Sequence, residues 1–215
     1  MNTIIFKENF HKIQFKCRSC GHCCRNSQIK LSPYDIIKIC ELECISTRQF
    51  HHKYSYFTFD KENQDLLTCM LKTSPECFFL KNNKCAIYPH RPVSCRTFPL
   101  AIQPFFNGNN LDLKHYILEE CLGFSSKGRI TLAEFKEMQG IEDKDLENFY
   151  SPWMKFKIKM MNTNVPRTEE YHRKFIQICY DFDNILAKLN RNLSSNDKYK
   201  LIIKLAEKQL LEPYL

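Results

Sequence analysis

The sequence predicts an α+β fold, in which a small cysteine-rich core with short hairpins precedes a mainly helical carboxy-terminal part. Three observations support this class. Nearly all the cysteines precede residue 130, asparagine-rich turns separate apolar runs in the same region, and capped helical patterns dominate afterwards. A chain of 215 residues can bury one sizeable core. We therefore expect a core at residues 1–130 and a helical region at residues 131–215 that packs on it.

Two helices are expected early in the cysteine-rich part. Ser32 is a good N-cap and a proline follows it at the first helical position. The apolar spacing then predicts a helix from Pro33 to about Cys44 and a shorter one over Thr47–Lys53. The aromatic residues of Tyr56–Phe59 indicate a short strand or a buried loop.

The segment 66–118 is predicted to be rich in strands. One apolar run stands alone, and the other runs form two pairs, each pair separated by an asparagine-rich turn that is typical of hairpins. Pro99 and Pro104 should keep one run irregular or at a sheet edge. The predicted runs are Leu66–Leu71, then Cys77–Leu80 paired with Cys85–Tyr88, and Phe98–Phe106 paired with Leu111–Leu118.

Helical signals dominate from residue 131 onwards. Thr131 and Glu134 form a capping box, and Gly140 is a suitable stop for the helix that they begin. Pro152 should kink or divide the helix that comes next. The later helices are expected over Asp143–Met160, from Glu169 to about Asn190 behind Thr168, and from Ser194 or Ser195 to about Leu211.

The bulk composition restricts the compartment and the partners. No apolar run is long enough to span a membrane, and the amino-terminal stretch lacks the features of a signal peptide. We therefore expect a cytoplasmic protein without a membrane partner, in which the 12 cysteines bind metal and do not form a disulfide framework. The net charge of +8 allows a nucleic-acid partner without favouring one.

The densest chemistry of the chain lies between Cys17 and Cys24. Cysteines stand at positions 17, 20, 23 and 24, and gaps of two residues let thiolates converge on a metal or on an iron–sulfur cluster. Side chains of neighbouring residues point in opposite directions in an extended backbone. On that assumption Cys23 and Cys24 would serve two metals, or two atoms of one cluster, more easily than one tetrahedral ion.

A second group of cysteines comes later, at Cys77, Cys85, Cys95 and Cys121. Together with the first group it supplies eight thiols, enough for two four-cysteine sites, although the sequence leaves open which cysteines share a site. Arginines close to these cysteines would offset thiolate charge, hold an anionic group, or be solvated surface residues; they are Arg25, Arg91 and Arg96. We expect the other cysteines to be structural rather than ligands; they are Cys40, Cys44, Cys69 and Cys179.

These residues together resemble the CxxCxxCC family, also called YkgJ-type cysteine-cluster proteins and described as zinc- or iron-chelating. The resemblance covers about residues 15–130 and implies metal or iron–sulfur binding. Some members are labelled flagellin lysine methylases, but no motif in the carboxy-terminal part carries that activity over. The matching pieces are Cys17-x2-Cys20-Gly-x-Cys23-Cys24-Arg25, Cys77-x-Phe-Leu80, Cys85-x-Ile-Tyr88, Arg91-Pro92-x-x-Cys95-Arg96-x-Phe98-Pro99 and Cys121-x-Gly123.

The thiol ligands alone do not separate zinc from iron. Eight thiols, the adjacent pair Cys23–Cys24 and the lack of regular histidine ligands favour an iron–sulfur cluster, with [4Fe–4S] as the expected type and zinc as the alternative. We found no triplet of cysteines with the Cys-x3-Cys-x2-Cys spacing of radical S-adenosylmethionine enzymes and no glycine-rich nucleotide loop.

Three hypotheses about function follow. The first is a metal-cluster protein with a redox or protein-modifying role and a protein or small-molecule partner that the sequence does not identify. The second is an enzyme that resembles an S-adenosylmethionine-dependent protein lysine N-methylase. The third is a zinc-stabilised module that binds nucleic acid or protein. The sequence does not decide whether the chain is an enzyme.

Overall fold

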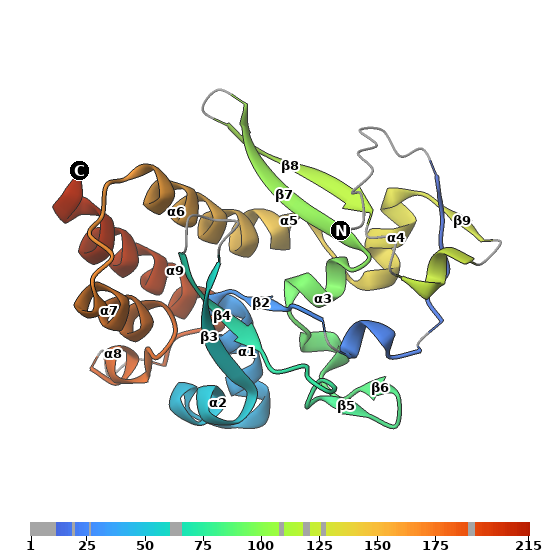
Figure 1. Cartoon of the computed structure of the whole chain (residues 1–215), viewed down its shortest axis with the longest axis horizontal. Helices are drawn as coiled ribbons and strands as arrows, with labels where there is room; N and C mark the ends of the chain where they lie inside the picture. The colour runs from blue at the N-terminus through green and yellow to red at the C-terminus, as the bar shows by residue number, and fades with distance from the viewer. Residues whose placement is uncertain are drawn as a thin grey trace. The chain divides into compact units, whose positions relative to one another are not determined.

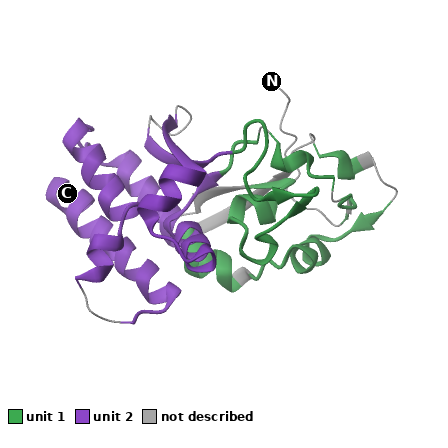
Figure 2. Cartoon of the chain, turned by 90° about the horizontal axis from the view of Figure 1, so that it is seen from below, with its two compact units in different colours: residues 1–29, 73–151 green, residues 30–72, 152–215 purple. Residues whose placement is uncertain are grey.

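The structure is a computed structural model, and it describes residues 12–18, 20–25, 27–60, 66–107, 110–117, 121–125, 128–188 and 192–215 (Figure 1). Helices accompany small antiparallel sheets, which confirms the α+β class. The chain divides into two compact units, one of residues 1–29 and 73–151 and the other of residues 30–72 and 152–215 (Figure 2). The sequence instead suggested a single boundary at residue 130.

Unit 1 contains three two-stranded antiparallel sheets among its described residues: β1 (Ile13–Gln14) with β9 (Arg129–Ile130), β5 (Leu80–Lys81) with β6 (Lys84–Cys85), and β7 (Leu100–Asn107) with β8 (Asn110–Ile117). Its helical elements are the 3-10 turns η1 (His22–Cys24), η3 (Tyr88–His90) and η4 (Leu122–Ser125), the helices α3 (Val93–Thr97), α4 (Leu132–Gln139) and α5 (Asp143–Asp145), and the π-helix η5 (Leu146–Tyr150).

The two predicted hairpins both form in unit 1. Asn82 and Asn83 have φ angles of 49° and 59°, the left-handed values that a tight turn between β5 and β6 requires. That hairpin is shorter than predicted, since its strand pairing is limited to Leu80 with Cys85 and Lys81 with Lys84. In the longer hairpin Pro104 lies inside β7, where a two-stranded ribbon leaves an unpaired side that tolerates a missing amide.

A small apolar cluster fixes the chain just before the first cysteine group. Phe15 packs against Leu100 and Phe135, and its ring lies 5.6 Å from that of Phe135 in an edge-on arrangement. Gly123 passes so close beneath Phe15 that a Cβ atom there would lie 2.6 Å from the Phe15 ring. The cluster therefore holds the strand that leads to Cys17 beside the segment that follows Cys121.

The capping predictions for the end of unit 1 are confirmed. Thr131 and Glu134 form a capping box on α4, and Gly140 ends that helix with a φ angle of 63°. Pro152 was expected to kink or divide the next helix. The structure has the π-helix η5 immediately before the proline, where a widened turn replaces the regular hydrogen-bond ladder.

Unit 2 is built around the sheet β2–β4–β3, formed by β2 (Lys30–Leu31), β4 (Leu66–Leu71) and β3 (Ser55–Asp60). Every residue of β4 is buried. The helical elements are α1 (Pro33–Glu43), α2 (Thr47–Tyr54), α6 (Ser151–Asn162), α7 (Glu169–Cys179), α8 (Asp183–Ala187), α9 (Ser195–Ala206), the π-helix η6 (Glu207–Leu211) and the 3-10 turn η7 (Glu212–Tyr214).

One predicted helix is wrong. The apolar spacing suggested continuous helix from Glu169 to Asn190, whereas α7 ends at Cys179 and α8 begins at Asp183. Because of this break, two carboxylates bind the first turn of α2 in unit 2. Asp183 accepts a hydrogen bond from the Thr47 amide at 2.6 Å, and Asp181 accepts one from the Thr47 hydroxyl at 2.8 Å. These bonds satisfy groups that a helix amino terminus leaves open.

His51 makes unit 2 sensitive to pH. Its Nε2 donates to the Tyr180 carbonyl at 3.0 Å, so its Nδ1 accepts a hydrogen bond from the Ser55 hydroxyl at 2.7 Å. Burial lowers the pKa of His51 below 6.5, which means that the unfolded chain binds the proton more readily. The contribution of His51 to the free energy of unfolding should therefore be fully present above about pH 6.5 and be lost as the pH falls below that value.

We expect His51→Gln to lower the free energy of unfolding at pH 7.5 by about 1–2 kcal/mol and to flatten its dependence on pH between 7.5 and 5.5. Urea unfolding at both pH values measures this, with His52→Gln as the matched control because His52 is exposed on the same helix. An equal pH dependence in His51→Gln and in the unsubstituted protein would show that His51 is not the source of the pH dependence.

Among the described helices, none combines the length and hydropathy that a membrane span needs.

Candidate metal centre

The cysteines separate cleanly between the two units. All eight predicted ligands lie in unit 1, and the four cysteines expected to be structural lie in unit 2. Cys69 and Cys179 are fully buried in unit 2, as predicted. Burial raises the pKa of the Cys69 thiol to about 12, and burial likewise raises the pKa of the Cys179 thiol, so both stay protonated. No disulfide joins any of the described cysteines.

The adjacent cysteines lie on a tight turn and not on extended backbone. Gly21, with a φ angle of 67°, begins the 3-10 turn η1, and the Cys24 amide donates to the Gly21 carbonyl at 3.0 Å. The two side chains hydrogen-bond to each other, which raises the pKa of Cys23 and lowers that of Cys24. The expectation that their sulfurs point in opposite directions is therefore wrong, because its premise of extended backbone fails.

Cys24 lies beside the second cysteine group. The Cys77 amide donates to the Cys24 carbonyl at 2.6 Å, and the Leu80 amide donates to the Cys77 carbonyl at 2.9 Å. Leu80 in turn pairs with Cys85 across the β5–β6 hairpin. Charge on Cys77, Cys95 and Cys85 raises the pKa of Cys24, in opposition to the hydrogen bond from Cys23 that lowers it. The backbone and the electrostatics thus associate Cys24 with the three cysteines of positions 77 to 95.

Cys121 lies beside the start of the first group. The Lys16 amide donates to the Gly123 carbonyl at 3.1 Å, which joins the residue before Cys17 to the turn after Cys121. Burial is the main cause of the raised pKa of Cys121, and charge on Cys23, Cys17 and Cys20 adds to it. Cys23 lies near cysteines of the second group as well, because its charge also raises the pKa values of Cys77 and Cys85.

Three of these sulfurs receive a backbone hydrogen bond from the residue two positions later. Burial raises the pKa values of Cys77, Cys85 and Cys121, and the amides of Phe79, Ile87 and Gly123 respectively lower them again. The Gly123 amide lies 3.4 Å from the Cys121 sulfur. An amide that points at sulfur stabilises the thiolate, which is the form that binds metal.

The predicted arginines have different surroundings. Arg25 is partly exposed and donates to the Gly21 carbonyl at 3.0 Å and to the Asn83 side chain at 2.9 Å, with Glu76 at 3.5 Å. It therefore joins the η1 turn to the tip of the β5–β6 hairpin. A surface ion pair of this kind contributes about 0–1 kcal/mol, so its effect is mainly to position the two turns.

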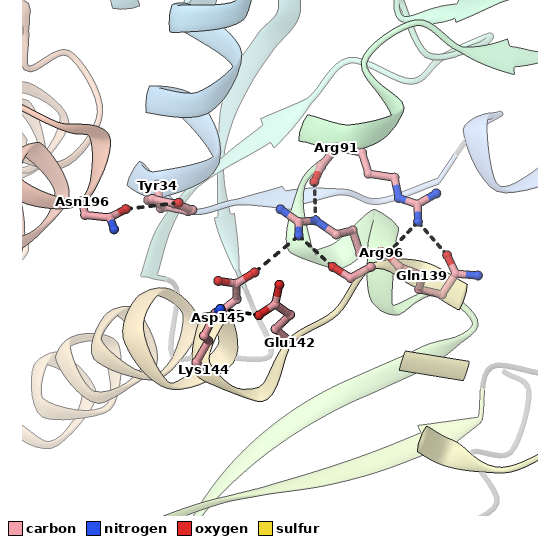
Figure 3. Close-up of polar contacts among 9 residues, drawn as sticks. Tyr34, Arg91, Arg96, Gln139, Glu142, Lys144, Asp145 and Asn196 are labelled. Carbon is pink, nitrogen blue, oxygen red and sulfur yellow. Dashed lines mark hydrogen bonds and ion pairs between the residues drawn. The ribbon is translucent and has the colours of Figure 1, made fainter. Parts of the chain in front are cut away.

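Arg91 and Arg96 both bind the carboxyl end of α4 (Figure 3). Arg91 is only 8% exposed, and its Nη2 donates to the carbonyl oxygen of Gln139 at 3.1 Å and to the side-chain Oε1 at 2.7 Å. Arg96 donates to the Arg91 carbonyl at 3.1 Å and to the Gly140 carbonyl at 3.3 Å. Cations are favourable at this end of a helix dipole.

Sequence reasoning missed Gln139 because it lies outside the cysteine-rich part and far from any cysteine along the chain. The available signal was its position just before Gly140, since the last carbonyls of a helix lack partners within the helix. Such a residue can present both its carbonyl and its side chain to a neighbouring arginine, as Gln139 does here.

The suitability of this region for metal rests on its donor chemistry. Within the described ranges, no group of three or more His, Cys, Asp or Glu side chains is arranged to hold a metal ion directly. The region nevertheless provides soft sulfur donors, amides that stabilise thiolates and a buried guanidinium whose charge partly opposes the raised pKa values of Cys23 and Cys85. This combination suits a thiophilic metal or an anionic cluster.

The comparison with protein families agrees with the donor chemistry. Residues 16–122 match the family model CxxCxxCC, described as a putative zinc- or iron-chelating domain. No curated protein and no solved structure matches the chain. The match begins just before Cys17 and ends just after Cys121, so it contains all the predicted ligand cysteines, and it confirms the resemblance noted in the sequence.

Proposed function

We propose, on the premise that residues 16–122 belong to the CxxCxxCC family of zinc- or iron-chelating domains, that unit 1 binds two metal groups through four thiolates each. One set would consist of Cys24, Cys77, Cys85 and Cys95, and the other of Cys17, Cys20, Cys23 and Cys121. The observation that carries the proposal is a pair of backbone contacts, in which the Cys77 amide donates to the Cys24 carbonyl and the Lys16 amide donates to the Gly123 carbonyl beside Cys121.

These backbone contacts, with the strand pairing of the β5–β6 hairpin, divide the cysteines in two. The bond between Cys77 and Cys24, together with the pairing of Leu80 and Cys85, brings the first set around the β5–β6 hairpin. The bond between Lys16 and Gly123 brings the ends of the second set together. The adjacent residues Cys23 and Cys24 would belong to different sets, and their hydrogen bond would be replaced by bonds to metal once both thiols lose their protons.

We infer that the groups are iron–sulfur clusters, with [4Fe–4S] as the expected type. Each set supplies four thiolates without a histidine, and the amides beside Cys77, Cys85 and Cys121 are the donors that stabilise anionic sulfur. When bound, such a cluster supplies one-electron transfer at a potential that its surroundings determine. A redox role is therefore the function that we favour. A second role, chelation of zinc alone, would use the same ligands.

We also propose a cell compartment and a class of partner for the metal-binding protein. Twelve cysteines with metal-ligand spacing suit a reducing compartment, and we propose the cytoplasm. A redox role needs an electron partner, which we expect to be a protein or a small molecule. Arg25 and Arg96 would hold the loops that carry the ligands, because their hydrogen bonds join those loops to Asn83 and Gly140.

Purification under anaerobic conditions followed by metal analysis tests the proposal. We expect about eight iron and about eight sulfide atoms per chain, with a broad absorption band near ~400 nm that dithionite bleaches. Colourless protein with about two zinc ions per chain would overturn the iron–sulfur assignment and keep the two four-thiolate sets. Protein that takes up neither metal under reducing conditions would overturn the proposed function.

A further inference from the structure

Arg91 is a buried cation whose hydrogen-bond acceptors are neutral. Only 8% of the residue is exposed, whereas arginines are rarely buried without a paired charge. Both hydrogen bonds from its Nη2 go to oxygens of Gln139, and its guanidinium carbon lies 3.7 Å above the centre of the Tyr88 ring. The described surroundings therefore hold the guanidinium in place without neutralising its charge.

One donor of Arg91 is buried and has no acceptor. Within the described part of the chain, no residue accepts a hydrogen bond from Nε, although that atom is closed off from solvent. A buried donor of this kind destabilises a fold unless a partner arrives. The loop that carries Arg91 also carries the predicted ligand Cys95, whose amide donates to the carbonyl of Pro92, the residue after Arg91, at 2.9 Å.

We propose that Arg91 donates a hydrogen bond from Nε to a sulfur of the bound metal group, and that its charge raises the reduction potential of the group and slows loss of the metal. This inference rests on the proposed function of the cysteine sets. A nearby cation favours the reduced form because reduction makes the cluster more negative. The same cation offsets the negative charge of a thiolate-ligated group, which stabilises the bound group against loss of its metal.

Gln139 is the positioning residue for this donor. Its carbonyl oxygen and its Oε1 both accept from Nη2 of Arg91, so they fix one corner of the planar guanidinium (Figure 3). Rotation about the rest of the side chain is limited by the Tyr88 ring. Because Gln139 ends α4, outside the matched residues 16–122, the contact makes residues beyond the family domain part of the metal environment.

The test compares metal-loaded full-length variants by two measurements: the rate of metal release to an excess of chelator, and the potential in a dithionite titration with redox mediators. We expect Arg91→Met to release metal about tenfold faster. We also expect about a tenfold change in the ratio of oxidised to reduced cluster, which lowers the potential by ~59 mV for one electron. Gln139→Met should shift both measurements in the same direction by about threefold. Gln139→Glu keeps the side-chain acceptor but pairs a carboxylate with Arg91, so its potential should also fall below that of the unsubstituted protein.

The matched control is Arg129→Met, which removes the same charge from an exposed position on β9 of unit 1 and should change neither measurement. Unchanged release and potential in folded, loaded Arg91→Met would overturn the inference, and so would effects equal to those of Arg129→Met. If Arg91→Met does not fold, the potential of loaded Gln139→Glu decides, and a potential equal to that of the unsubstituted protein would overturn the inference. Metal analysis of the unsubstituted protein reports separately on the proposed function, and the release measurement applies to zinc as well as to iron.

Discussion

Serine at position 24 is expected to remove about half of the bound metal, and serine at position 121 is expected to remove the other half. Each substitution takes one thiolate from a different proposed set, and a serine oxygen is a poor ligand for a soft metal site. Cys24 is associated with Cys77, Cys85 and Cys95, whereas Cys121 is associated with the first cysteine group. The double variant should therefore hold almost no metal. Metal and sulfide analysis of each purified variant measures this.

Cys44→Ser is the matched control for these variants. Cys44 is exposed like Cys17 and Cys20, but it lies at the end of α1 in unit 2. It should keep the full metal content. If Cys24→Ser and Cys121→Ser each keep full metal, the ligand sets are wrong. If either one loses all of it, the two groups are not independent, and a single shared site replaces the division that we propose.

Removal of the metal should unfold the cysteine-bearing loops of unit 1 and leave unit 2 folded. None of the three residues of η1, which include Cys23 and Cys24, is buried, so side-chain packing holds this turn only weakly. Metal binding to such a stretch is coupled to its folding. By contrast, unit 2 has a buried strand, β4, and helices whose apolar faces are covered. The two parts should therefore respond very differently to a strong chelator.

Hydrogen–deuterium exchange reports this difference by segment. We expect protection in residues 20–25 and 77–95 to fall by at least ~100-fold after chelation under reducing conditions, with protection in α1 and α9 unchanged. Restoring the metal should restore protection in the same segments. Equal protection with and without metal in residues 20–25 would contradict coupled folding, and equal losses in α1 would show that the metal stabilises the whole chain.

Local signals in the sequence predicted the elements of the fold well. Ser32 and Thr131 begin helices with full capping boxes, and Gly140 ends one, because each device depends on residues close together in the chain. The continuous helix after Glu169 was wrong because a distant partner decides its end. Asp181 and Asp183 serve the first turn of α2, and no local pattern reveals that contact.

For the candidate site too, the sequence showed the local features and missed the contacts between distant residues. Spacing and composition predicted eight ligand cysteines, all of which lie in unit 1 and within the family match, and their role as ligands stays a prediction. The assumption of extended backbone at Cys23 and Cys24 was wrong because the two residues lie on a 3-10 turn, which Gly21 alone does not reveal. The contact between Arg91 and Gln139 joins residues far apart in the chain, so only the fold brings it into view.

The number of metal groups per chain tests the central claim most directly. Native mass spectrometry of anaerobically prepared protein should show the chain with the added mass of two groups, roughly 700 Da for two [4Fe–4S] clusters or roughly 130 Da for two zinc ions. The added mass should halve in Cys121→Ser. A chain that carries one group when fully loaded, or none, would contradict the proposal that its eight cysteines form two four-thiolate sites.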